Sequence, residues 1–252
     1  MIILLTNDDG YESEGINTLE RVLLSYGHEI WVCAPSGNRS AQSHAMNILS
    51  PVTLTKYKEN HFHCSGTPTD CILYSIKGGV FPHHPDLVIS GINHGYNCSS
   101  DILYSGTCGA ASEAVLQGLP AIALSCERGD DNSFSFESAA TFVANNIEKL
   151  ITITTKDSIV NLNFPSPHSN RIVTAGIGKI IYNDFAIPIE KTEEKITFKL
   201  SAGGNVEKGI NSNHDNTDLH ITTKGDIALS VIKVLPEINI EKQNEAMRLF
   251  NA

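Results

Sequence analysis

The chain begins with Met1-Ile-Ile-Leu-Leu-Thr-Asn-Asp-Asp-Gly10, an apolar run that ends in a polar turn. Residues 2–5 are all apolar, and a run this short predicts a β-strand that is buried on both faces. The Asn-Asp-Asp-Gly sequence after it is typical of a turn. Asp8 and Asp9 are therefore expected just beyond the carboxyl end of a parallel strand, where open α/β sheets form their ligand clefts.

Two interpretations of this acidic pair are open. Adjacent carboxylates repel each other, so a protein that keeps both charged at one strand end commonly supplies a cation. The same four residues also suit a plain turn that leads into a helix. This stretch alone does not decide between metal binding and a structural turn.

The residues that follow predict a strand–helix–strand unit. Apolar residues at 16, 19, 23 and 26 recur with helical spacing, and Gly27 ends the pattern as a glycine does after a helix. A second apolar strand is expected at 29–34, before Pro35. A helix that links two strands over this short length favours a right-handed βαβ unit with parallel strands.

The rest of the first two thirds continues in the same way. A short hairpin is expected at 52–57 and 61–65, and a helix should start at Thr67-Pro68, with Asp70 as a helix-starting residue. Further strands are expected at 85–90, 120–125 and 159–163, and further helices at 110–118 and 136–150. The pattern predicts an α/β fold with a mostly parallel sheet flanked by helices.

Beyond Pro165 the alternation stops. Extended segments are expected at 171–181 and 195–200, with polar sequence between and after them, including Gly203-Gly204 and residues 211–218. A strand at 226–231 and a helix at 240–250 should close the chain. The whole is expected to be one domain, with a core at 1–178, an extended β-rich arm at 179–218, and a returning strand and C-terminal helix at 219–252.

The composition excludes several kinds of function. The 252 residues carry a formal net charge of -10, which argues against binding to a nucleic-acid polymer. No apolar run is long enough to cross a membrane, and the N-terminus lacks a signal peptide, so a cytoplasmic location is expected. The six cysteines form no C-x-x-C pair and are expected to be free thiols in a reducing compartment.

Four polar loops follow predicted strands or precede a helix, at 7–10, 36–43, 90–97 and 105–107. In a parallel sheet these positions converge on one edge, so the loops should share a cleft. The carboxylates of Asp8 and Asp9, with Asn93, Ser40 and Thr107, offer hard oxygen donors. Such a set suits Mg²⁺, Mn²⁺ or Ca²⁺ better than zinc or copper.

The Ser105-Gly106-Thr107 sequence adds an anion site. It stands directly before a predicted helix, whose first backbone N–H groups are available to a phosphate. A metal site beside a phosphate site indicates phosphoryl chemistry.

Other polar residues have simpler interpretations. Arg39 is equally suited to contact a phosphate or to pair with a neighbouring carboxylate. His94 is interpreted as an exposed neighbour of the metal loop. His61, His63 and Cys64 do not form a zinc site on a strand, because alternation sends Cys64 to the face opposite the two histidines.

Five segments of the first 125 residues resemble, in order and spacing, the sequence blocks of the SurE (survival protein E) nucleotidases. They are Asn7-Asp8-Asp9-Gly10, Asn38-Arg39-Ser40, Gly66-Thr67-Pro68-Thr69-Asp70-Cys71, Ser90-Gly91-Ile92-Asn93-His94-Gly95-Tyr96-Asn97 and Tyr104-Ser105-Gly106-Thr107. Beyond residue 125 the resemblance is thinner, and the arm matches loosely.

The resemblance implies a Rossmann-like fold and a metal-dependent phosphomonoesterase, a 5′-nucleotidase that acts on nucleoside 5′-monophosphates and, in some members, on 3′-monophosphates and short polyphosphate. It implies one Mg²⁺ or Mn²⁺ per subunit, and a homodimer or homotetramer formed through the C-terminal arm. Carried over by position, the metal ligands are Asp8, Asp9, Ser40 and Asn93. Asp8, Asp9 and Asn93 are also the implied catalytic residues, and the implied phosphate-binding residues are Asn97, Ser105, Gly106 and Thr107.

Rival functions were weighed against this one. The main alternative is a non-catalytic regulatory protein that binds metal and nucleotide, because binding and catalysis use the same residues. A receiver domain would need an aspartate at the end of a later strand, where this chain has Ser90-Gly91-Ile92-Asn93. A haloacid-dehalogenase-type phosphatase would need Asp-x-Asp after the first strand, where this chain has Asp8-Asp9-Gly10.

Overall fold

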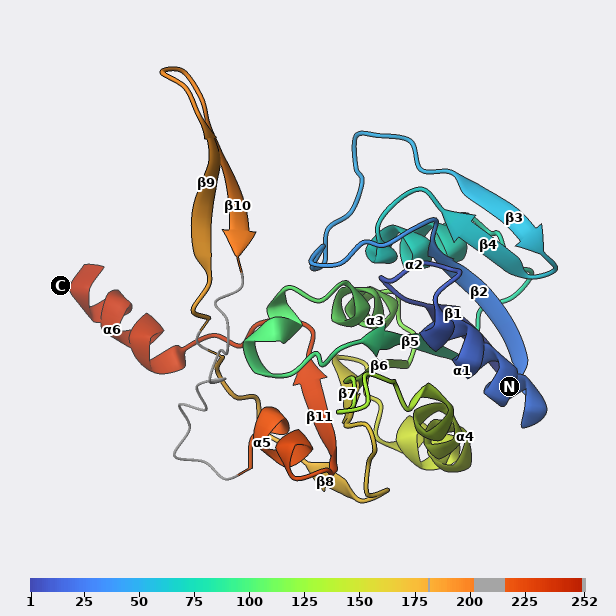
Figure 1. Ribbon diagram of the computed structural model, residues 1–252. Coiled ribbons are helices and arrows are strands. Elements are labelled where there is room, and N and C mark those ends of the chain that lie inside the picture. The colour runs from blue at the N-terminus through green and yellow to red at the C-terminus, as the bar shows by residue number, and fades with distance from the viewer. Residues whose placement is uncertain (181, 202–215, 251–252) are drawn as a thin grey trace.

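The computed structural model describes residues 1–180, 182–201 and 216–250. The residues that it describes form one large sheet, a separate hairpin, and helices on both faces of the sheet (Figure 1). The strands of the large sheet are β1 (Ile2–Thr6), β2 (Glu29–Pro35), β3 (Leu54–Lys58), β4 (His61–Cys64), β5 (Leu87–His94), β6 (Ala121–Cys126), β7 (Ser158–Phe164), β8 (Ile172–Thr174) and β11 (Ile227–Lys233). The hairpin consists of β9 (Phe185–Lys191) and β10 (Ile196–Ser201). The helices are α1 (Glu14–Ser25), α2 (Pro68–Lys77), η1 (Ser99–Leu103, a 3₁₀ helix), α3 (Gly106–Leu116), α4 (Phe136–Thr152), α5 (Asp218–Thr223) and α6 (Ile240–Phe250).

The strand order of the large sheet is β3-β4-β2-β1-β5-β6-β7-β11-β8. The six strands from β4 to β7 in this order are parallel, and β3 pairs antiparallel with β4. At the other end β11 runs antiparallel to β7 and parallel to β8. The predicted α/β fold with a mostly parallel sheet and a C-terminal β-rich arm is confirmed. The reversal at β11 was not predicted.

The core has two layers because the apolar residues of each central strand alternate between the faces of the sheet. In β1, Ile3 and Leu5 pack with α1 and α4, whereas Leu4 packs on the other face with α2 and α3. All three side chains are fully buried. Burial on both faces explains why the run at 2–5 contains no polar residue.

Four differences from the sequence analysis have physical reasons. Residues 91–94 were expected in a loop, but β5 continues to His94 with a bulge between Ser90 and Asn93. Gly91, at φ +135°, makes that bulge possible, since a Cβ there would lie 2.3 Å from the carbonyl oxygen of Leu124. Glycine and asparagine at 91–93 therefore mark a bulge within a strand.

The other three differences lie after residue 165. Strand β9 was not predicted, although Phe185, Ile187 and Ile189 alternate along it; Pro188 and the exposure of its whole length obscure the pattern. Of the extended segment expected at 171–181, only Ile172–Thr174 forms a strand. Helix α5 has six residues, too few to show a helical period. The polar segments expected at Gly203-Gly204 and in most of 211–218 lie outside the described residues.

The hairpin of β9 and β10 projects away from the sheet, and α6 also lies apart from it (Figure 1). No residue of α6 is buried. None of the helices in the described part of the chain has the length and apolar character needed to cross a bilayer.

Candidate active site

The loop after β1 is fixed by its own asparagine. The Asn7 side chain accepts a hydrogen bond from Gly10 N (3.1 Å) and donates one to Gly10 O (2.8 Å). Gly10 has φ +107° and lies so close to Gly37 that a Cβ would be 3.2 Å from the Gly37 Cα. This closed turn holds Asp8 and Asp9 at the carboxyl end of β1. The sequence analysis assigned no role to Asn7. The turn-forming sequence at residues 7–10 is the feature from which its role could have been predicted.

Asp8 is buried under the first turn of α3. Its side chain is 4% exposed, and its Oδ1 accepts a hydrogen bond from the Thr107 hydroxyl (2.6 Å). A Cβ on Gly106 would lie 2.8 Å from the Asp8 Cβ, so only glycine allows the helix to approach this closely. Burial raises the pKa of Asp8, and the charge of Asp9 acts in the same direction, while the bond from Thr107 opposes them.

Asp9 is held by His94 from the bulged end of β5. The backbone N–H of His94 donates to Asp9 Oδ2 (3.1 Å), and His94 Nδ1 lies 2.8 Å from the same oxygen. The bond to Asp9 raises the pKa of His94. Phe134 and Phe136 contact the His94 ring edge-on, at centroid distances of 4.9 and 5.0 Å. The interpretation of His94 as an exposed neighbour of the metal loop is confirmed, but its direct bond to Asp9 was not predicted.

Arg39 links the loop after β2 to the same point. Its backbone N–H donates to the Asp8 carbonyl (2.6 Å). Its guanidinium donates to the carbonyl oxygens of Gly66 (3.2 Å) and Ser65 (2.9 Å). Neither expected role for Arg39 describes these contacts, since its side chain is engaged by backbone carbonyls that tie the loop after β2 to the loop after β4.

Ser40 and Asn93 stand next in the chain to residues that contact the acidic pair. Ser40 follows Arg39 in an exposed turn, where its N–H donates to the Asn38 side chain (2.9 Å). Asn93 precedes His94, and its amide nitrogen donates to Gly95 O (2.9 Å). Ser40 therefore lies in the loop after β2, and Asn93 lies at the bulged end of β5, and both segments contact the acidic pair through the neighbouring residue.

Asn97 is held from three sides by buried side chains. Its N–H donates to Asn163 Oδ1 (2.8 Å), and its carbonyl accepts from Asn161 (2.9 Å) and Asn163 (3.2 Å). Its own amide nitrogen donates to the Ser125 hydroxyl (2.8 Å). The sequence analysis missed these three partners. For Asn161 and Asn163, the sequence feature that could have indicated this role is the presence of two asparagines in β7, a strand buried along its whole length.

The first turn of α3 completes the cluster. Ser105 is the N-cap, and its hydroxyl accepts from Cys108 N (3.0 Å). Ser105, Gly106 and Thr107 are all buried. The N-terminus of this helix, with its partial positive charge, therefore faces the carboxylate of Asp8.

The other polar residues that the sequence analysis singled out have structural roles. Asp70 completes a capping box with Thr67, as the helix-starting interpretation predicted. His61 Nε2 lies 2.8 Å from Glu20 Oε1, and His63 stacks on Tyr11. In the described ranges no group of three or more His, Cys, Asp or Glu residues is placed to hold a metal ion. The candidate ligand set differs in kind, since it combines two carboxylates with an amide and a hydroxyl.

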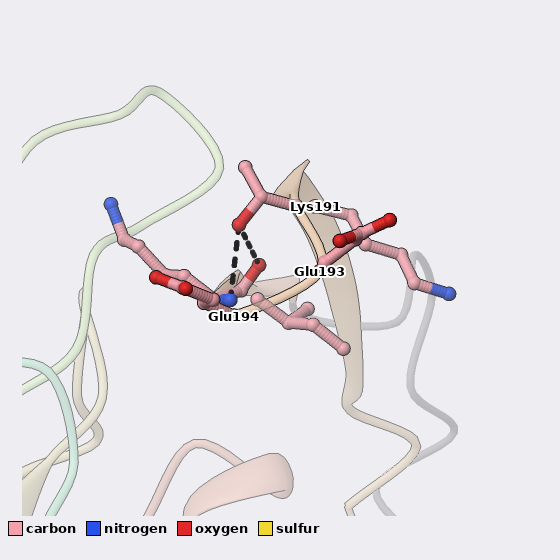
Figure 2. Close-up of a pocket in the computed structure, with 6 residues that line it drawn as sticks. Lys191, Glu193 and Glu194 are labelled. Atoms are coloured by element: carbon pink, nitrogen blue, oxygen red, sulfur yellow. Dashed lines mark hydrogen bonds between the residues drawn. The ribbon is translucent and has the colours of Figure 1, made fainter.

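The hollow shown in Figure 2 is not a second candidate site. It lies at the tip of the hairpin, between β9 and β10, and is lined only by residues 191–196. The Thr192 hydroxyl accepts from Lys195 N (3.0 Å) and so closes the turn (Figure 2). The hollow is the concave side of one exposed turn, without side chains from any other element.

Comparison with known proteins identifies relatives of the whole chain. The family model described as "Survival protein SurE" matches residues 3–185. The chain is 37% identical over 190 residues to a "5′-nucleotidase SurE" from Mesorhizobium japonicum, covering 73% of this chain and 75% of that protein. It is 30% identical to the "5′-nucleotidase SurE" of Phenylobacterium zucineum over 93% of this chain and 91% of that protein. The crystal structure of the SurE protein from Aquifex aeolicus is 28% identical, covers 99% of both chains and superposes with a TM-score of 0.82.

These matches place an α/β sheet with an acidic cluster at its carboxyl edge within a known class of hydrolases. The chain belongs to the SurE family. The comparisons confirm both the predicted family and the predicted class of enzyme, a 5′-nucleotidase.

Proposed function

We propose that the cluster around Asp8 and Asp9 is the active site, and that it hydrolyses nucleoside 5′-monophosphates to nucleoside and inorganic phosphate. One observation carries the proposal: the N-terminus of α3 is packed directly onto a buried carboxylate, with the Thr107 hydroxyl 2.6 Å from Asp8. A phosphate bound by the first N–H groups of α3 would therefore lie beside the acidic pair. Some activity on 3′-monophosphates and short polyphosphate is part of the proposal.

The donor set fits one divalent cation, Mg²⁺ or Mn²⁺, per subunit. Asp8 and Asp9 are adjacent, and each already accepts a hydrogen bond at one oxygen, Oδ1 of Asp8 and Oδ2 of Asp9. Asn93 engages its amide nitrogen with Gly95, which leaves its oxygen as the atom suited to a cation. With the Ser40 hydroxyl, these residues would hold the ion through oxygen alone, as Mg²⁺ and Mn²⁺ prefer.

When bound, such an ion would neutralise charge on the phosphate and polarise a P–O bond. The chain's own residues then have separate roles. One of the two carboxylates, Asp8 or Asp9, positions the attacking water and accepts its proton, which then passes to the departing nucleoside oxygen. Asn93 would help to hold the ion through its side-chain oxygen. Asn97, Ser105, Gly106 and Thr107 bind the non-reacting phosphate oxygens, with the backbone N–H groups at the start of α3 as donors.

Phosphate release from a panel of 5′- and 3′-nucleoside monophosphates, with Mg²⁺, with Mn²⁺ and with EDTA, tests the proposal. We expect metal-dependent release that is fastest with 5′-monophosphates. Release that persists in EDTA would contradict the metal site. A folded protein that binds nucleotide but releases no phosphate under any of these conditions would favour the non-catalytic alternative.

We propose that the hairpin and α6 form the contact between subunits in a homodimer or homotetramer. Large apolar side chains on the hairpin are exposed on both strands, among them Phe185, Ile189, Phe198 and Leu200, at 53–69%. Met247 and Phe250 on α6 are also exposed. An apolar surface of this kind is typical of an interface. The division into a core at 1–178, an arm at 179–218 and a returning segment at 219–252 belongs to the same proposal.

A cytoplasmic location is also proposed. All six cysteines lie in the described residues, are buried and form no disulfide. A secreted protein of this cysteine content would commonly carry disulfides.

A further inference from the structure

Residues 98–104 connect two parts of the proposed phosphate site. Asn97 stands at one end of this segment and Ser105 at the other, with η1 between them. The segment is closed on itself, since Asp101 O accepts hydrogen bonds from Tyr104 N (2.9 Å) and Ser105 N (3.1 Å). Ser99, at its start, has φ +55°, a left-handed conformation that a serine adopts only when its neighbours hold it there. The shape of this segment sets the distance between Asn97 and Ser105.

One buried carboxylate holds the start of the segment. Asp218, the first residue of α5, is fully buried, and its Oδ2 accepts a hydrogen bond from Ser99 N (2.6 Å). Its Oδ1 accepts from the Ser99 hydroxyl (2.7 Å), Leu219 N (2.8 Å) and Gly178 N (3.4 Å). Bonds of this kind to a charged acceptor are short and about twice as strong as neutral ones. Both polar hydrogens of Ser99 are thus directed at a side chain more than 100 residues away in the sequence.

The base of the arm packs against the same segment. Ile180 N donates to the Ser100 hydroxyl (3.1 Å), and the Tyr182 hydroxyl donates to the Asp101 carboxylate. Beneath these bonds, Cys98, Ile180 and Leu219 form a small apolar cluster of their own. Residues 176–180, Tyr182 and α5 therefore act as one support under residues 98–104.

We propose that Asp218 is a positioning residue of the nucleotidase, whose buried carboxylate holds residues 98–104 in the shape that places Asn97 and the Ser105–Thr107 loop around the substrate phosphate. The proposal rests on the proposed phosphate-binding role of those four residues. Asp218 itself contacts neither the acidic pair nor the loop, and acts through Ser99. Loss of its carboxylate should loosen the phosphate site and leave the acidic pair in place.

The test is the substitution Asp218→Asn, which turns one acceptor oxygen into a donor facing the N–H and O–H groups that now bind it. We expect KM for a 5′-monophosphate and the inhibition constant of inorganic phosphate to rise about tenfold, the effect of one hydrogen bond to a charged group. We expect kcat to stay within about threefold, because a positioning residue for binding removes ground-state and transition-state contacts alike.

The matched control is Asp226→Asn. Asp226 is also a buried carboxylate beside α5, but it binds Ser169 and Arg171 on the side of β8, away from residues 98–104. Asp226→Asn should lower the melting temperature without moving KM. If both variants raise KM equally, the effect of Asp218 is general destabilisation, and the proposal is overturned.

A second variant keeps the proposal testable if Asp218→Asn does not fold. Ser99→Gly tolerates the positive φ and removes only the hydroxyl bond to Asp218, so a KM increase of about threefold is expected. The double variant should be no worse than Asp218→Asn alone, because both changes break one link. If the KM increases of the two single variants were additive in the double variant, Asp218 would not act through Ser99.

Thr107→Val separates this proposal from the one on which it rests. If Thr107→Val leaves KM and phosphate inhibition unchanged, the assignment of the phosphate loop fails, and the proposal for Asp218 fails with it. If Thr107→Val weakens phosphate binding but Asp218→Asn does not, the loop assignment stands and the positioning role alone is refuted.

Discussion

The carboxyl edge of the sheet and the β9–β10 hairpin differ in the contacts that hold them in place. At the sheet edge, loops from four strands or helices meet on two carboxylates, and each loop is fixed by named hydrogen bonds to Asp8, Asp9 or Asn97. In the hairpin, the described strands bond only to each other, and residues such as Phe198 and Leu200 are 56% and 69% exposed. Figure 1 shows the hairpin standing clear of the helices that cover the sheet.

The difference shows where each region obtains its stability. The edge of the sheet is supported by a core in which residues such as Leu4 and Ile89 are fully buried. An isolated two-stranded hairpin is at best marginally stable in water. The hairpin therefore depends on whatever covers it, whereas the site depends on the packing beneath it. The experiments below alter one region at a time.

The largest effect is expected from the acidic pair. Asp8→Asn or Asp9→Asn should lower kcat/KM by on the order of 10³-fold or more, since groups that act as one unit lose most of their effect together. The fold should persist, which circular dichroism and thermal unfolding would show. Glu12→Gln, an exposed acid in the same loop, is the control and should retain activity. An active double variant that still binds metal would remove the assignment.

A second, smaller loss is expected from Gly106→Ala. The new Cβ would lie 2.8 Å from the Asp8 Cβ and 3.1 Å from the Pro68 Cγ, so α3 must move away from the carboxylate. We expect kcat/KM to fall about 10- to 100-fold, because displacement of a catalytic group by about 1 Å has effects of that size. Gly37→Ala is the control, since its Cβ would meet no atom within 4 Å. Equal activity of both variants would show that α3 does not need to touch Asp8.

The third experiment is directed at the hairpin. Phe198→Ser combined with Leu200→Ser should dissociate the proposed homo-oligomer, because each apolar side chain that it would bury contributes roughly 2 kcal/mol. Light scattering after gel filtration would give the mass. Lys199→Ser, between the two on the same strand, should leave the assembly unchanged. If the double variant keeps the mass of the unaltered protein, the hairpin is not the contact between subunits.

The same comparison explains what the sequence could predict. The strand at 2–5 and the turn at 7–10 could be predicted from the sequence, because a buried strand and a tight turn each leave a local sequence pattern. The placement of Asp8 and Asp9 at the sheet edge follows from them. The pairing of Asp9 with His94 does not, because it depends on the pairing of β1 with β5 and on the bulge between Ser90 and Asn93. Only the fold brings positions 9 and 94 together.

The arm shows the opposite limit. Exposed strands give a weak pattern, so β9 was missed although its residues alternate. Asp218 was expected only as the end of a polar stretch, because its bonds to Ser99 span 119 positions and leave no local pattern in the sequence. A short helix such as α5 depends on the residues that pack against it, and it is too short to show a helical period in the sequence.

The smallest effect is expected from Glu20, which is not one of the proposed site residues. Glu20 on α1 accepts hydrogen bonds from His61 (2.8 Å) and Lys58 (2.6 Å). The bond to His61, more than that to Lys58, lowers the pKa of Glu20 from 4.5 to about 2. A carboxylate whose pKa is lower in the folded state stabilises the fold fully above its unfolded pKa, and loses that contribution as the pH falls toward its folded pKa.

We therefore expect Glu20→Gln to lower the free energy of unfolding by about 1–2 kcal/mol at pH 6, the partial exposure of the Lys58 pair reducing the effect. The difference from the unaltered protein should shrink between pH 4.5 and pH 2, the interval over which folded Glu20 becomes protonated. Urea unfolding at several pH values would measure it, with Glu59→Gln, an exposed acid on the β3–β4 turn, as the control. A difference that stays constant down to pH 2 would show that Glu20 contributes through packing and not through its charge.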